Sequence, residues 1–171
     1  MANSSRSRLK TFGTLGAILT IFSTFVAWYS FRAVFTVPAL EIWVPRSLWS
    51  LYPLAAALLT AAAFAGLALV NVPSLAPSRT AGAIIALLGI AIVVYSAVRV
   101  FDVPALGVTE VPRPAGYAPL EQDTQLDGGP FLSLAGGFLL TLGSLPMLVA
   151  AGERQRSFAA HGRTATGAPR V

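Results

Sequence analysis

The sequence predicts an all-α integral membrane protein, a four-transmembrane-helix bundle that arose by tandem duplication of a two-helix hairpin. The 171-residue chain is 55% hydrophobic and only 11% charged, which is too apolar for an ordinary water-soluble domain. Four long uncharged stretches each reach the roughly 20 residues that a membrane-spanning helix needs. Two separated segments also repeat each other, and such self-similarity indicates duplication.

The expected helices occupy four apolar stretches that are rich in Leu, Ala and Ile. In chain order these stretches are residues 11–31, 51–72, 80–98 and 128–152. Together they predict a single membrane domain over residues 1–171, which ends in a flexible, basic cytoplasmic tail at residues 153–171.

The internal repeat is clearest where the first and third stretches end. Residues 29–40 read YSFRAVFTVPAL, and residues 95–106 read YSAVRVFDVPAL. Apolar composition alone does not reproduce a VPAL segment twice. We therefore expect repeat 1 at about residues 11–72 and repeat 2 at about residues 80–152. Both copies would enter the membrane from one side, so a pseudo-two-fold axis should run along the membrane normal.

Small residues recur at helical spacing on the first and third stretches. Small side chains let helices approach closely in lipid, where packing replaces the hydrophobic driving force. We expect these two faces to meet across the pseudo-two-fold axis. The expected packing seam consists of Gly16, Thr20, Ser23 and Ala27 on one side and Gly82, Ala86 and Gly89 on the other.

The basic residues predict how the chain is oriented. Most of them flank the ends of the stretches that share one side with the termini, whereas the opposite side carries most of the acidic residues. Because Lys and Arg are retained on the cytoplasmic side, we expect a multi-pass plasma-membrane protein with cytoplasmic N and C termini. Aromatic residues gather at the outer ends, which indicates an aromatic belt at the lipid headgroups or, alternatively, a docking surface.

No constellation of residues in the sequence predicts catalysis. There is no cysteine, and the single histidine, His161, lies in the basic tail, whereas zinc and haem sites need ligands within the fold. Serine nucleophiles in the helices would lack an activating base. We expect no enzyme activity, no cofactor and no nucleic-acid partner. The expected partners are membrane lipids and other integral membrane proteins.

The outer loops hold the candidate contact residues for a partner protein or a lipid headgroup. They are Glu41, Trp43 and Arg46 in the first copy and Glu110 and Arg113 in the second. Neighbouring prolines stiffen both segments. The alternative is that these loops are rigid connectors whose charges simply face water.

The last apolar stretch reads GPFLSLAGGFLLTLGSL, and the chain is Ala-rich and uses Arg in preference to Lys. In these features it resembles small four-span actinobacterial membrane proteins of the tryptophan-associated membrane protein type. The resemblance covers mainly the last two stretches. It implies a four-span membrane fold and carries no catalytic residue over to this chain.

Two functions are compatible with these patterns. We expect a non-catalytic accessory or scaffolding subunit of a larger cell-envelope complex, because packing faces and an aromatic outer surface are abundant. The alternative is a small carrier or lipid-binding transporter with a site between the two repeats. A polar cavity at mid-membrane would favour the carrier, and a tightly packed axis would favour the subunit.

Overall fold

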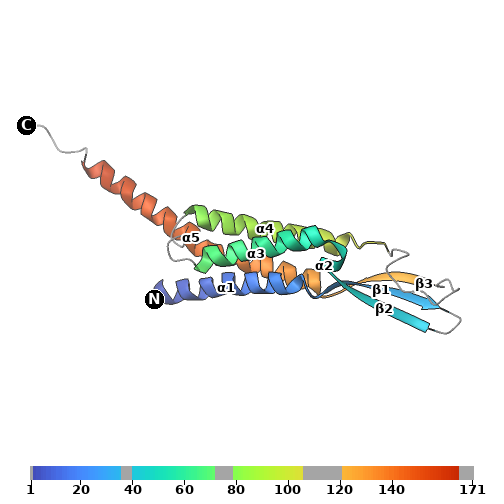
Figure 1. The fold of residues 1–171 in the computed structure, drawn as a ribbon. Helices are drawn as coiled ribbons and strands as arrows, with labels where there is room; N and C mark the ends of the chain where they lie inside the picture. The colour runs from blue at the N-terminus through green and yellow to red at the C-terminus, as the bar shows by residue number, and fades with distance from the viewer. Residues whose placement is uncertain (1, 36–39, 72–78, 106–120, 166–171) are drawn as a thin grey trace, which may run out of the picture.

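The computed structural model describes residues 2–35, 40–71, 79–105 and 121–165. Long helices lie side by side, and a small sheet projects from one end of them (Figure 1). In chain order the elements are α1 (Ala2–Ser23), β1 (Ala27–Phe35), β2 (Leu40–Ser47), α2 (Leu48–Leu51), α3 (Pro53–Asn71), α4 (Arg79–Phe101), β3 (Glu121–Leu126) and α5 (Gly129–Ala165).

The fold is mixed, so the prediction of an all-α four-transmembrane-helix bundle is wrong. The three strands form one antiparallel sheet in the order β2-β1-β3. Helix α1 ends at Ser23, and the residues expected to complete the first transmembrane helix form the central strand β1 instead. The polar residues 121–126, which lie between the third and fourth expected helices, form the edge strand β3.

Alternation of side chains explains why residues 27–35 form a strand. Phe31, Ala33 and Phe35 are all at most 2% exposed, whereas Arg32 and Val34 between them are half-buried. A period of two matches the pleat of a strand and does not match a helix. Aromatic and β-branched residues also favour strands. The segment is apolar enough to resemble a membrane helix, but its pattern fits one buried sheet face.

The repeat does not correspond to two equivalent hairpins. Residues 29–35 belong to β1, whereas the matching residues 95–101 lie in the last turns of α4. Similar sequence therefore folds as a strand in one place and as a helix in the other, since burial and neighbouring strands override local preference. The expected duplication of a two-helix unit about a pseudo-two-fold axis is wrong for this fold.

Three of the described helices are long and apolar enough to cross a membrane. They are α3, α4 and the first part of α5, Gly129–Val149. Helix α1 is not among them, because Arg6, Arg8 and Lys10 occupy its first half. Large apolar side chains are exposed on the outward faces of these helices, for example Leu54, Leu87 and Phe138. Such faces are compatible with a membrane location.

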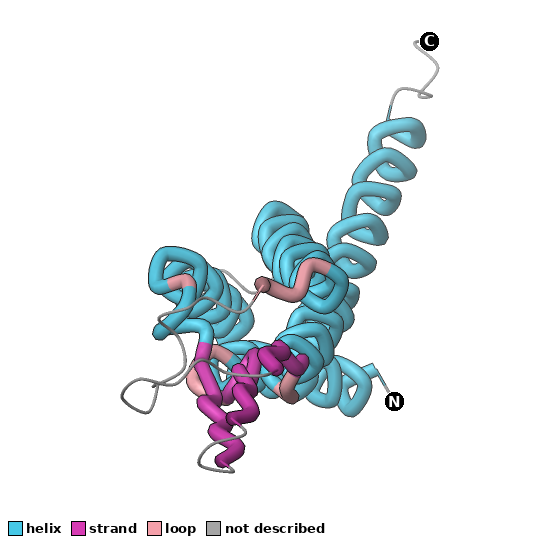
Figure 2. Tube along the Cα trace, turned by 90° about the vertical axis from the view of Figure 1, so that its right-hand side faces the viewer, coloured by secondary structure: helices cyan, strands magenta, loops and turns pink. Residues whose placement is uncertain are grey.

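Helix α5 lies between α1 and α4 and makes its most extensive contacts with these two helices. Figure 2 views the molecule from the sheet end and shows the helices grouped behind the magenta strands. Leu140 of α5 is completely buried, and its side chain fills the space beside Gly66 of α3. The centre of the helical part is therefore packed with apolar side chains.

Two adjacent glycines of α5 bring the helices together. A Cβ atom added to Gly136 would lie 2.8 Å from the carbonyl oxygen of Gly16 in α1. A Cβ atom added to Gly89 of α4 would lie 2.8 Å from the carbonyl oxygen of Gly137. These separations leave no room for a methyl group, so backbone packs on backbone on both sides of α5.

The small residues expected to form a seam are distributed along these contacts. Gly16 and Thr20 lie against Gly136, Gly89 lies against Gly137 and Thr141, and Gly82 lies against Met147. Both faces thus pack on α5. Ser23 is buried at the end of α1, Ala86 is half-buried on α4, and Ala27 belongs to strand β1.

We predict that Gly136→Ala destabilises the protein by about 1–3 kcal/mol, because the added methyl group would overlap the α1 backbone and the Thr20 hydroxyl. The matched control is Gly128→Ala, since Gly128 has no atom within 4 Å of an added Cβ. Unfolding in detergent, followed by tryptophan fluorescence, measures both variants. Equal midpoints would contradict the close approach of α5 to α1.

Candidate functional site

The outward face of the sheet carries a row of polar side chains. Neighbouring residues of a strand point to opposite faces, and the register places Arg32 of β1 between Trp43 of β2 and Asp123 of β3. Val34, the next residue on this face, lies between Glu41 and Glu121. One charged face and one apolar face therefore share the same three strands.

Arg32, Glu41 and Trp43 form a connected cluster on this face, which we call the sheet cluster. Arg32 Nε donates a hydrogen bond to Glu41 Oε1 over 2.8 Å, and Trp43 Nε1 donates to the same oxygen over 2.6 Å. The Arg32 guanidinium also lies 5.4 Å from the centre of the Trp43 ring. Each side chain thus holds the other two in one arrangement.

The sheet cluster is open to solvent. Trp43 is 42% exposed, and the Arg32 and Glu41 side chains are 31% and 44% exposed. An exposed ion pair of this kind contributes at most about 1 kcal/mol to folding. Stability alone does not account for a connected Trp, Arg and Glu on one exposed face of the sheet. The cluster is instead well suited to contact another molecule, because Trp and Arg dominate the energetics of protein interfaces.

A hollow of about 440 Å³ adjoins the sheet cluster on the β3 side. Arg32, Val34, Glu121, Gln122 and Asp123 line it. Its two carboxylates outnumber its single guanidinium, and Arg32 already shares its charge with Glu41. The hollow therefore favours a basic group over an acidic one.

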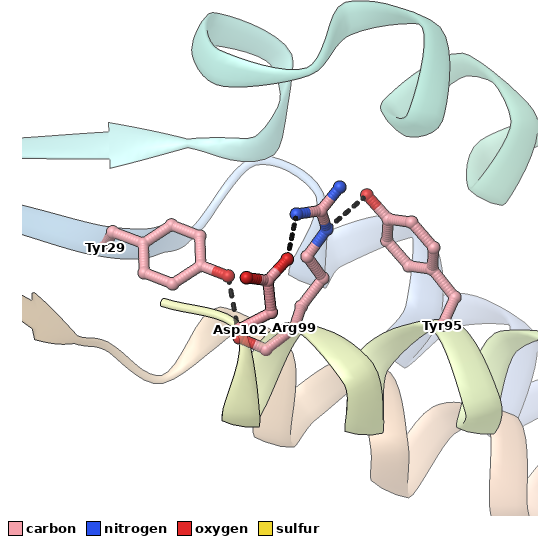
Figure 3. A network of polar contacts seen from close by, with 4 residues as sticks. All are labelled: Tyr29, Tyr95, Arg99 and Asp102. Carbon is pink, nitrogen blue, oxygen red and sulfur yellow. Dashed lines mark hydrogen bonds and ion pairs between the residues drawn. The ribbon is translucent and has the colours of Figure 1, made fainter. Parts of the chain in front are cut away.

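A second polar cluster ties the sheet to the helices, as Figure 3 shows. Near the end of α4, Arg99 Nε donates to the Tyr95 hydroxyl over 3.3 Å, and Arg99 Nη1 donates to Asp102 Oδ2 over 3.3 Å. Tyr29 of β1 donates from its hydroxyl to the Arg99 carbonyl oxygen over 2.7 Å. The Arg99 guanidinium also lies 4.3 Å from the centre of the Tyr52 ring.

This junction cluster joins β1, α4 and Tyr52, the residue between α2 and α3, at one point. Burial raises the pKa of the Tyr29 phenol from 10.0 to about 12, so the hydroxyl remains a donor throughout the physiological range. The neighbouring Trp28 is fully buried, and its Nε1 donates to the Ser23 carbonyl oxygen over 2.7 Å. These hydrogen bonds fix the side chains of Trp28 and Tyr29 against the helices. The first residues of β1 therefore have a fixed direction relative to the helices.

The candidate contact residues from the sequence fall into three groups. Glu41 and Trp43 belong to the sheet cluster. Arg46 lies opposite Tyr29 in the β1–β2 register, on the other face of the sheet and half-buried. Glu110 and Arg113 lie outside the described residues.

The structure gives the aromatic residues and Arg99 roles other than the aromatic belt that the sequence predicts. Trp28 and Tyr29 are fully buried, so they do not belong to a belt exposed to headgroups. Tyr95 and Arg99 are spaced four residues apart on α4, which is a contact spacing in helices. This spacing is the one sequence pattern from which the contact between Tyr95 and Arg99 could be predicted. The pairing of Arg32 with Glu41 depends on the sheet register and had no local signal.

No family model matches the chain, and no curated protein matches it.

We predict that Arg99→Gln destabilises the protein by about 2 kcal/mol, because it removes a partly buried cation from two aromatic rings and a tyrosine hydroxyl. Arg32→Gln is the matched control and should change stability by less than about 1 kcal/mol, since its partners are exposed. Unfolding midpoints of the two variants in the same detergent give the comparison. If Arg32→Gln proved the more damaging change, the junction cluster would not be what holds the sheet.

Proposed function

We propose that this chain is a non-catalytic accessory or scaffolding subunit of a larger cell-envelope complex, in which the sheet docks a partner protein. The observation that carries the proposal is the exposed, ordered sheet cluster on a sheet held firmly at the end of the helices. Ordering these side chains before binding lowers the entropy cost of association. A scaffolding subunit needs this combination of a membrane anchor and a fixed docking surface.

The chemistry of the surface indicates what kind of partner fits. Trp43 offers an exposed apolar ring with a polar edge, and the adjacent hollow is lined by Glu121 and Asp123. A partner with a basic side chain beside an apolar one would complement both features. The partner we propose is another integral membrane protein of the same envelope, whose outer portion reaches the level of the sheet.

The charge distribution supports an orientation with the sheet outside and both termini in the cytoplasm of a multi-pass plasma-membrane protein. In this orientation α1 also crosses, with its uncharged residues 11–23 packed along α5 beside the three longer apolar helices. The start of α1 and the end of α5 lie at the end of the molecule opposite the sheet (Figure 1). That end carries a basic series: Arg6, Arg8, Lys10, Arg79, Arg154, Arg156 and Arg163. The sheet end carries Glu41, Asp102, Glu121, Asp123 and Asp127 against Arg32, Arg46 and Arg99, so its described residues have a net negative charge. Positively charged ends stay in the cytoplasm.

The alternative function, a carrier with a central binding site, has less support. Leu140 fills the space beside Gly66, and Gly136 and Gly137 bring the backbones of α1 and α4 against α5. A carrier would need space for a solute between these helices. Their tight packing favours the scaffolding proposal.

A single-cysteine crosslinking experiment tests both the docking and the orientation. The chain has no native cysteine, so Gln125→Cys places one thiol at an exposed position on β3, on the same sheet face as Arg32. A membrane-impermeant maleimide carrying a photoreactive group is added to spheroplasts of the native host. We expect a covalent adduct with one larger membrane protein, identified by mass spectrometry.

Three further variants decide the interpretation. Adding Trp43→Ala to Gln125→Cys should lower the adduct yield about tenfold or more, as expected for a central aromatic contact. Adding Thr124→Ala, which lies opposite Phe31 on the other face of the sheet and does not line the hollow, should leave the yield unchanged. Thr80→Cys, at the start of α4, should react only after the spheroplasts are permeabilised. An adduct indifferent to Trp43→Ala would contradict docking, and reaction of Thr80→Cys in sealed spheroplasts would contradict the orientation.

A further inference from the structure

A groove of about 410 Å³ lies between α1 and α3, at the end of the molecule opposite the sheet. Its lining divides into a polar part and an apolar part. The polar part consists of Lys10, Thr11, Thr14 and Asn71, and the apolar part consists of Leu15 and Ile18. The groove is separate from both the sheet cluster and the junction cluster.

The polar part presents positive charge and hydrogen-bond donors. Asn71 Nδ2 donates to Thr14 Oγ1 over 3.3 Å and to the Leu67 carbonyl oxygen over 2.9 Å, which fixes the amide. Because Thr14 Oγ1 accepts this bond, its own hydrogen can be donated to a ligand. Lys10 is exposed, and neither α1 nor α3 contains an acidic residue that could neutralise it.

The apolar part continues the groove along the outer face of α1. Leu15 and Ile18 are 44% and 51% exposed, and they follow Thr11 at helical spacings of four and seven residues. A ligand bound here would therefore place a charged group beside Lys10 and an apolar portion along the next two turns. The order along the helix, from charge to hydroxyl to aliphatic, matches the order from headgroup to acyl chain in a phospholipid.

We propose that this groove binds an anionic phospholipid of the cytoplasmic leaflet. Its phosphodiester group accepts from Lys10 and the Thr14 hydroxyl, and an acyl chain lies along Leu15 and Ile18. Neither α1 nor α3 contains Asp or Glu, so these helices offer no carboxylate to pair with the cation of a choline headgroup. This favours a lipid with an anionic headgroup over phosphatidylcholine. The proposal depends on the membrane location and is independent of partner docking.

Lipid retention by the purified full-length chain tests the proposal. The protein is reconstituted in nanodiscs with equal amounts of phosphatidylglycerol and phosphatidylcholine, and the lipids that remain bound are measured by native mass spectrometry after release. The wild-type chain should retain phosphatidylglycerol preferentially. Lys10→Gln should lower that preference about fivefold, the effect expected for one basic residue at a membrane surface. Lys10→Arg should restore it.

Further variants and a competitor separate the alternatives. Thr14→Val should weaken retention while keeping the charge, and Arg32→Gln at the sheet end should leave retention unchanged. Unfolding midpoints of every variant show whether a loss of retention reflects loss of fold. Equal retention of the two lipids, or an unchanged preference in Lys10→Gln, would overturn the proposal. Displacement of phosphatidylglycerol by millimolar inorganic phosphate would also overturn it, since the acyl contacts would then contribute nothing.

Discussion

The arrangement of the whole molecule depends on the close contact of α5 with α1 on one side and with α4 on the other. Gly136 and Gly137 allow these contacts because they present bare backbone to Gly16 and Gly89. With α1 and α4 both fixed against α5, the C-terminal end of α4 comes to lie beside the start of β1. Tyr29 can then reach the Arg99 carbonyl oxygen. The direction of the sheet thus follows from helix packing in the apolar part of the chain.

The sequence predicts the apolar helices better than it predicts the sheet. Residues 53–71 and 79–101 form helices close to their expected positions, because long, uncharged, Leu- and Ala-rich runs have few other stable structures in lipid. The sequence prediction is wrong for residues 27–31, because they continue the uncharged run that starts at residue 11. Along the strand, more buried and less buried residues alternate. In the sequence this period of two is hard to see, because the segment directly follows the apolar run of α1. The polar strand 121–126 has weak intrinsic preference and depends on pairing with β1.

The candidate site was predictable only in part. Glu41 and Trp43 stand out in the sequence as a charge and an aromatic residue near prolines, and both belong to the sheet cluster. Arg32 joins them through strand register, and register is a long-range property that no local pattern contains. Arg46 is close to them in sequence, but it lies on the other sheet face for the same reason. Alternation along β2 separates neighbours that the sequence presents as one group.

Residues 27–35 form the middle strand of the sheet, whereas the sequence predicts that residues 27–31 end a transmembrane helix. Disulfide trapping tests this strand directly in the otherwise cysteine-free chain. Val34 and Glu121 lie opposite each other in the β1–β3 register, so Val34→Cys with Glu121→Cys should form an intramolecular disulfide under mild oxidation. Val34→Cys with Gln125→Cys is out of register and should not. No disulfide in the first pair, or equal yields in both pairs, would contradict the sheet.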